Sequence, residues 1–157
     1  MSSACPKQKL VNNALDIEIF NHQRDLLIDH CYVRKVLKTL CVLKNVETHK
    51  VILHFVTAET ICEVHDTVFG DPSFTDCVTC PIDTPDQELP YHVLGECFIC
   101  PLAAIQSAPQ TPHQELLLYI VHCFLHMLGY EDTHPQQRDI MQHEEQRLLK
   151  ALNTEIA

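Results

Sequence analysis

Four short runs of β-type residues, separated by longer stretches with helical periodicity, limit most strongly how this chain can fold. The runs cover residues 15–20, 51–56, 75–82 and 91–100. Apolar residues recur at helical spacing over residues 23–45, and capping and helix-breaking residues delimit three further predicted helices, at residues 57–70, 111–128 and 134–152. Strands and helices alternate at first, and two helices close the chain. The order favours an α+β or α/β layered fold, and we predict α+β, with a single layer of about four strands packed against about five helices.

Several residues predict where these helices begin and end. Thr57 is suited to cap the second helix, and Gly70 to end it. Thr111 and Pro112 predict the start of the third helix, because proline at the first helical position loses no hydrogen bond. Gly129 predicts where that helix stops.

Length and composition favour one folded domain over residues 1–157. The chain has 157 residues and is 46% hydrophobic, which suffices for a buried core. The first residues lack the apolar run of a secretory signal, and no stretch is apolar enough for a membrane span. The nine cysteines, an odd number, are then better interpreted as reduced thiols. We expect a cytoplasmic protein that does not contact membranes.

The charge is distributed unevenly. The formal net charge is −10, and no Lys or Arg occurs between Val51 and Gln137. Such a surface repels nucleic acid over most of its area. Any contact with RNA is therefore expected to use the earlier basic residues Arg34, Lys35 and Lys38, a bound cation, or a partner.

Two histidines and an aspartate predict a metal site on the third helix and the loop after it. His122 and His126 are four residues apart, so both side chains lie on one helical face. Gly129 then lets the chain turn back, and Asp132 follows in the pattern H-x3-H-x2-G-x2-D. Three side-chain ligands leave a fourth position for water, which is typical of catalytic zinc. The alternative is an apolar helix with two hydrogen-bonded histidines.

The same spacing occurs in metalloproteases, where a glutamate follows the first histidine and activates water. Here that position is Cys123, which is a poor base in an apolar helix. Glu115, about two turns before His122 on the same face, is a candidate for a catalytic base. It is equally well explained as an acid that stabilises the start of a helix.

Two cysteine pairs offer a second metal-binding hypothesis. Cys77 and Cys80, and then Cys97 and Cys100, have the C-x2-C spacing of a zinc ribbon. Both pairs lie in β-type runs, however, where positions three apart face opposite ways. We favour buried strand residues, because cysteine behaves as a small hydrophobe.

Several segments resemble the YbeY family of metal-dependent endoribonucleases. The stretch HCFLHMLGYED (122–132) resembles the family motif H-G-x-L-H-L-x-G-Y-D-H, and Met141 and Glu145 follow on the next helix. TDCVTCP (75–81) resembles its T-D-V-L-S-F-P strand, and LGECFIC (94–100) its L-G-D-I-x-I strand. QEL (114–116) resembles its H-E-L. In this comparison Gly70 occupies the position where most members carry an arginine. Asp132 occupies the position of the third metal ligand, and His134, two residues later, is the alternative third ligand.

The resemblance implies one Zn2+ per chain and cleavage of single-stranded RNA. By the same resemblance, the protein acts in ribosomal RNA maturation at the 16S 3′ end and in ribosome quality control. Its expected partners are single-stranded rRNA and the ribosome, and no DNA. Two alternatives stay open: a non-catalytic ribosome-associated factor with a structural zinc, and a zinc hydrolase of another substrate such as a peptide.

Overall fold

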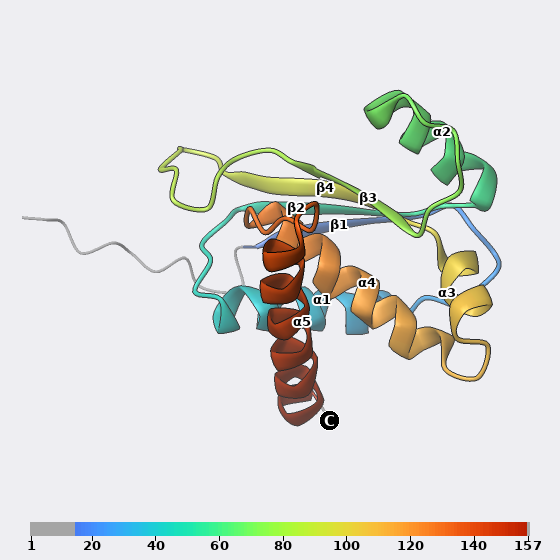
Figure 1. Cartoon of the computed structure of the whole chain (residues 1–157). Coiled ribbons are helices and arrows are strands. Elements are labelled where there is room, and N and C mark those ends of the chain that lie inside the picture. Colours follow the sequence, from blue (N-terminus) through green and yellow to red (C-terminus); the bar gives the residue numbers. More distant parts are fainter. Residues whose placement is uncertain (1–14, 157) are drawn as a thin grey trace, which may run out of the picture.

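The computed structural model describes residues 15–156, which form one mixed sheet and the helices packed on it (Figure 1). The strands are β1 (Asp16–Asn21), β2 (Lys50–Phe55), β3 (Cys77–Pro81) and β4 (Val93–Ile99). The helices are α1 (His30–Leu43), α2 (Ala58–Phe69), α3 (Pro101–Ser107), α4 (Pro112–Met127) and α5 (Pro135–Ile156). Among these described residues, no helix is both long and apolar enough to cross a membrane.

The sheet has the order β1-β2-β4-β3. β1, β2 and β4 run parallel, while β3 pairs antiparallel with β4 and forms one edge of the sheet. Figure 1 shows α1, α4 and α5 on one side of the sheet and α2 on the other. The predicted α+β class, with four strands and five helices, is confirmed.

The core lies between the sheet and α4. In β2, Val51, Leu53 and Phe55 alternate with less buried residues and point into this core. Nine of the sixteen residues of α4 are buried. Each such apolar side chain contributes about 1.5–3 kcal/mol when it leaves water. Within this largely buried helix, His122 and His126 keep 27% and 24% of their side-chain surface exposed.

One glycine lets α4 lie close to the sheet. A Cβ atom at Gly95 of β4 would lie 2.8 Å from Cγ of Met127 and 3.1 Å from the carbonyl oxygen of Cys80. Met127 is the last residue of α4, and it packs directly over the glycine. The end of α4 that carries His126 is thereby held against β3 and β4.

The structure differs from the sequence prediction at two places. α1 begins at His30 rather than at residue 23, because the side chain of Asp29 caps it by accepting from the Tyr32 amide. The side chain of Gln23 bonds both the amide and the carbonyl of Leu26, which stabilises a loop there instead of a helical turn. The second difference is α3, which the sequence pattern indicated only as a short apolar segment.

Candidate metal centre

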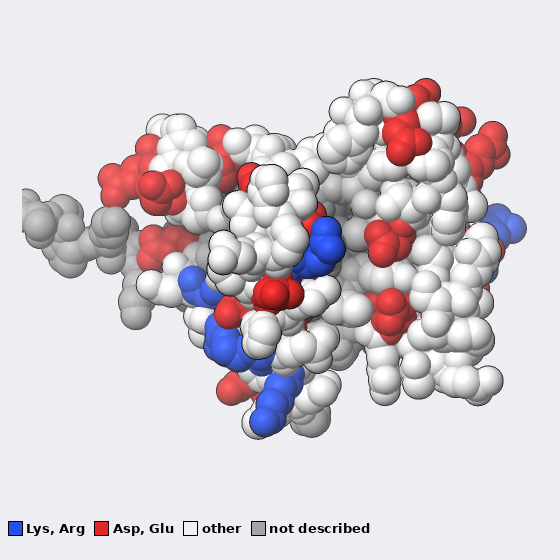
Figure 2. Space-filling model, in the orientation of Figure 1, with Lys and Arg blue, Asp and Glu red and all other residues white. Residues whose placement is uncertain are grey.

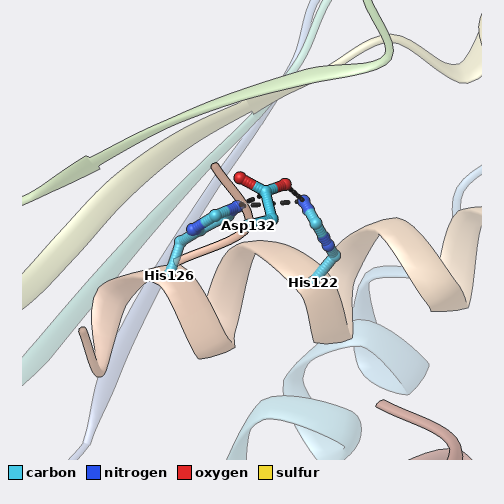
Figure 3. A group of neighbouring side chains, drawn as sticks. All are labelled: His122, His126 and Asp132. Atoms are coloured by element: carbon cyan, nitrogen blue, oxygen red, sulfur yellow. Dashed lines mark hydrogen bonds and ion pairs between the residues drawn. The ribbon is translucent and has the colours of Figure 1, made fainter. Parts of the chain in front are cut away.

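Three side chains converge beside the sheet (Figure 3). Nε2 of His122 lies 3.0 Å from Nε2 of His126. Oδ2 of Asp132 lies 3.6 Å from each of these nitrogens. Among the described residues 15–156, these three form the one group of histidine, cysteine or acidic side chains with the proximity needed to hold a metal ion.

The turn after α4 brings Asp132 back to the histidines. α4 is capped at Leu128, and Gly129 adopts φ +99°, which L-residues rarely adopt. The amide of Tyr130 then donates to the carbonyl of Leu125. Nε of Arg138 donates to the carbonyl of Asp132 over 3.2 Å and so ties the loop to α5.

Each histidine is oriented through its Nδ1 atom. Nδ1 of His126 lies 2.9 Å from the carbonyl oxygen of Tyr130, to which it donates. Nδ1 of His122 lies 2.5 Å from Oε1 of Glu145, a buried residue of α5. With protons on both Nδ1 atoms, both Nε2 atoms present lone pairs toward the same point, which is the arrangement that metal-binding histidines require.

Glu145 also changes the acidity of its partner. Burial lowers the pKa of His122, but the hydrogen bond and the negative charge of Glu145 outweigh it, and the net pKa is raised. The sequence pattern predicted the helix that bears Glu145 but did not predict the hydrogen bond between Glu145 and His122. Glu145 lies 23 residues after His122, so no local spacing indicates that the two side chains meet.

The distances between the three ligand atoms fit a single small cation. Two ligand atoms about 2.1 Å from a tetrahedral zinc ion lie about 3.4 Å apart. The observed separations of 3.0 and 3.6 Å bracket this value. Two imidazoles and a carboxylate are also a donor set that zinc accepts. The residues present therefore fit a bound zinc.

The triad opens on a cleft of about 530 Å³. One wall is β3 with the preceding loop, another is the end of α2, and the third is the loop after α4. Figure 2 shows this face hollowed between α2 and the loop after α4. The lining includes the acids Asp76, Glu131 and Asp132, and none of the described lining residues is Lys or Arg.

The basic residues lie elsewhere. Arg34, Lys35 and Lys38 of α1, one of the expected sources of RNA contact, are not among the cleft-lining residues. Arg138 instead lines a smaller adjoining cavity together with His122 and Asp132. On the face shown in Figure 2, blue side chains lie beside red ones over α5, whereas the charged side chains over α2 and the β3–β4 loop are red.

Two further candidate residues lie outside the triad. His134 is exposed and is not part of the metal-binding group. Glu115 lies in the first turn of α4 and does not line the cleft. The interpretation of Glu115 as a base stays a prediction.

The cysteine pairs do not form a metal-binding group in the described part of the chain. Cys97 is buried in β4 and pairs across the sheet with Thr79 of β3. The thiols of Cys77 and Cys97 lie against that of Cys123, which is itself buried between α4 and the sheet. Cys80 faces the other way, as strand alternation requires. Cys123 therefore packs in the core, and no glutamate stands at the position that activates water in a metalloprotease.

Comparison with known proteins agrees with this architecture. The family model "Endoribonuclease YbeY" matches residues 18–153. A relative from Chlamydia pneumoniae, named Endoribonuclease YbeY, is 36% identical over 146 residues and covers 89% of this chain and 92% of its own length. A relative of the same name from Chlamydia abortus is 40% identical over 143 residues, covering 86% and 89%.

A solved structure shares the fold. The solution structure of TM1509 from Thermotoga maritima superposes with a TM-score of 0.60 at 22% sequence identity. The match covers 86% of this chain and 87% of the other.

Proposed function

The chain belongs to the YbeY endoribonuclease family, and from this premise we propose that it is a zinc-dependent, single-strand-specific endoribonuclease. Its proposed role is ribosomal RNA maturation at the 16S 3′ end and ribosome quality control, in the cytoplasm, as one domain of residues 1–157. The proposed partners are single-stranded rRNA, which is the substrate, and the ribosome.

The observation that carries this proposal is the open triad. Three ligand side chains lie at the wall of a cleft rather than in a closed core. A structural zinc is usually enclosed by four protein ligands, whereas three ligands leave a position that water or a phosphate oxygen can reach.

The residues at the triad have separate proposed roles in holding the metal, orienting the histidines and contacting the RNA. His122, His126 and Asp132 would hold the zinc, and a bound zinc would acidify water and stabilise negative charge on a phosphate oxygen. Glu145 and the carbonyl of Tyr130 hold the two imidazoles in the required tautomer. Arg138 carries a positive charge beside Asp132 and would contact a phosphate of the bound strand.

The acidic lining of the cleft supports a second candidate function, that of a non-catalytic ribosome-associated factor. Without Lys or Arg among the described lining residues, the cleft offers little attraction to the phosphates of a strand. Gly70, at the position where most members carry arginine, has φ +67° and ends α2. These features favour, as the alternative, a non-catalytic ribosome-associated factor whose metal stabilises the loop between α4 and α5.

The test compares RNA cleavage with metal content on the same sample. Zinc-loaded protein is incubated with single-stranded rRNA fragments, with the same fragments in duplex form, and with intact ribosomes. We expect zinc-dependent cleavage of the single-stranded fragments and none of the duplex. The His122→Ala variant, checked for its fold by circular dichroism, should lose cleavage.

If the zinc-loaded protein cleaves neither the fragments nor the ribosomal RNA, the catalytic proposal fails. Cosedimentation with ribosomes in that case would favour the non-catalytic factor. Cleavage that continues in His122→Ala at the wild-type rate would indicate a contaminating nuclease.

A further inference from the structure

β3 presents an unpaired edge to the cleft. In the antiparallel pairing of β3 with β4, the amide of Cys100 donates to the carbonyl of Asp76, and the amide of Ile82 donates to that of Leu94. Hydrogen-bonded pairs alternate with non-bonded pairs along such a ladder. Residues 76, 78, 80 and 82 therefore direct their backbone groups toward β4, and Cys77, Thr79 and Pro81 direct theirs outward.

The outward groups lie in the cleft that contains the triad. Cys77, Thr79 and Pro81 all line it, as do His122 and His126. No other strand of the described residues pairs with this edge. Cys77 and Thr79 each offer one N–H donor and one C=O acceptor, while Pro81 offers only its carbonyl.

Another wall of the cleft, the end of α2, carries an exposed aromatic ring. Phe69, the last residue of α2, lines the cleft and is 63% exposed. Its ring lies edge-on against that of His65, with centroids 5.4 Å apart. Nδ1 of His65 is 3.0 Å from the carbonyl oxygen of Ser73, a contact that fixes His65 against the loop after α2. A large apolar ring at this position costs solubility and contributes little to the core.

A backbone edge and an aromatic ring together match the chemistry of an unpaired nucleobase. Each base carries a donor and an acceptor side by side on its Watson–Crick edge, and one residue of a free strand edge can satisfy both. The face of the same base can stack on an aromatic side chain. The acids of the cleft repel phosphates but accept hydrogen bonds from the amino groups of bases.

We propose that the cleft is a nucleobase subsite, formed by the free edge of β3 at Cys77 and Thr79 and by the ring of Phe69. This proposal rests on the proposed function and specifies how the substrate binds. Bases enter the acidic part of the cleft, and the phosphate backbone stays near the triad and Arg138. Only unpaired bases have a free Watson–Crick edge, so the subsite selects single strands. Because every base offers a suitable pair of groups, it selects little among sequences.

The first experiment removes the ring. Binding of a labelled single-stranded decaribonucleotide to zinc-loaded protein is measured by fluorescence anisotropy, beside an abasic strand of equal length and the decaribonucleotide annealed to its complement. We expect Phe69→Ala to weaken binding of the decaribonucleotide about tenfold or more. Phe69→Tyr should restore it. Binding of the abasic strand should be weak in the wild type and unchanged in the variants.

The matched control is Phe74→Ala. Phe74 is also exposed, at 45%, but does not line the cleft, so its loss should leave binding unchanged. Both phenylalanines lie at the surface, so neither variant should unfold, and zinc content should stay at the wild-type level.

The second experiment removes a donor from the edge. Thr79→Pro deletes an outward N–H at a position equivalent to Pro81, where the strand already tolerates proline. We expect weaker binding of the decaribonucleotide with zinc content retained. Thr79→Val, which keeps the N–H, should bind as the wild type does.

The outcomes separate the two proposals. If the wild type cleaves RNA but Phe69→Ala and Thr79→Pro bind it normally, the subsite is wrong and the proposed function stands. If the wild type binds RNA through Phe69 but never cleaves it, the subsite stands and the nuclease function fails. A lysine-rich decapeptide that binds the wild type but not Thr79→Pro, with RNA binding unchanged, would assign the edge to a peptide and overturn the subsite.

Discussion

A few side chains determine whether the site can hold a cation. The Nε2 atoms of His122 and His126 lie 3.0 Å apart, which is hydrogen-bonding distance, so without a cation one of the two nitrogens carries the shared proton. A bound cation takes the place of that proton and accepts a lone pair from both nitrogens. Asp132 supplies the negative charge that makes the set favourable for zinc.

The assignment of Asp132 rather than His134 as the third metal ligand can be tested by substitution. We expect Asp132→Ala to weaken zinc binding at least tenfold, because its Oδ2 atom lies 3.6 Å from both histidine nitrogens. His134→Ala should bind zinc as the wild type does, since His134 lies outside the group. Competition with a chromophoric chelator measures both affinities. The reverse ranking would mean that the loop rearranges when metal binds.

Glu145 should act as a positioning residue. Glu145→Gln leaves the volume of the side chain but removes the charge that holds the Nδ1 proton of His122. We expect zinc affinity to fall about 10- to 100-fold. Glu144→Gln is the matched control, because Glu144 bonds Lys44 and Arg147 instead. Equal affinities for the two variants would contradict this role.

At the scale of the elements, the turn after α4 links helix geometry to the metal site. α4 supplies two ligands by spacing alone, but the third depends on the chain reversing after Leu128. Gly129 makes this possible with its positive φ, and no atom lies within 4 Å of the position its Cβ would occupy. A substitution there would be resisted by backbone conformation alone.

Gly129→Ala should therefore cost about 1–2 kcal/mol of folding stability and should also lower zinc affinity. Gly70→Ala is the matched control. Gly70 also has a positive φ and no atom within 4 Å of the position of an added Cβ, but it lies at the end of α2 and not in the turn that positions Asp132. Gly70→Ala should lose comparable stability with little change in zinc affinity. Urea denaturation and chelator competition measure the two quantities. Normal zinc affinity in Gly129→Ala would show that Asp132 is positioned by other contacts, such as that with Arg138.

At the scale of the whole molecule, the charge asymmetry of the sequence becomes a division of the surface. The cleft lining includes acids and no Lys or Arg, while α1 carries Arg34, Lys35 and Lys38 without an acid and α5 carries charges of both signs. An RNA strand bound at the triad is expected to direct its bases and its phosphates to different regions. Apart from a zinc held by the triad and Arg138 beside it, electrostatic attraction then acts on the strand outside the cleft.

Metal removal should change the stability of the whole fold. We expect one equivalent of zinc per chain, and free zinc at 100 times its Kd should stabilise the protein by about 2.7 kcal/mol. Chelation should then lower Tm by about 5–10 °C. Cys80→Val and Cys97→Ala should leave the zinc content at one equivalent, because neither cysteine belongs to the metal group. Two equivalents in the wild type and one in either variant would show a second site.

The sequence by itself determined the features that depend on local spacing. Strand alternation and helical periodicity predicted the four strands and most helices, although α1 begins later than expected and α3 was not predicted as a helix. The i,i+4 spacing on α4 fixed the relation of His122 to His126, since helix geometry alone brings them to one face. The glycine at residue 129 predicted the turn that returns Asp132.

Only the tertiary structure decided which distant residues complete the site. Glu145 reaches the triad because α5 packs against α4. β3 has a free edge because it is the last strand of the sheet, and this edge lines the same cleft as Phe69. Arg34, Lys35 and Lys38 of α1, which were one predicted source of RNA contact, do not line the cleft. Sequence spacing constrains neighbours within a turn or a strand, whereas contacts across elements follow from how apolar faces pack. That packing fixes which polar groups share a cleft.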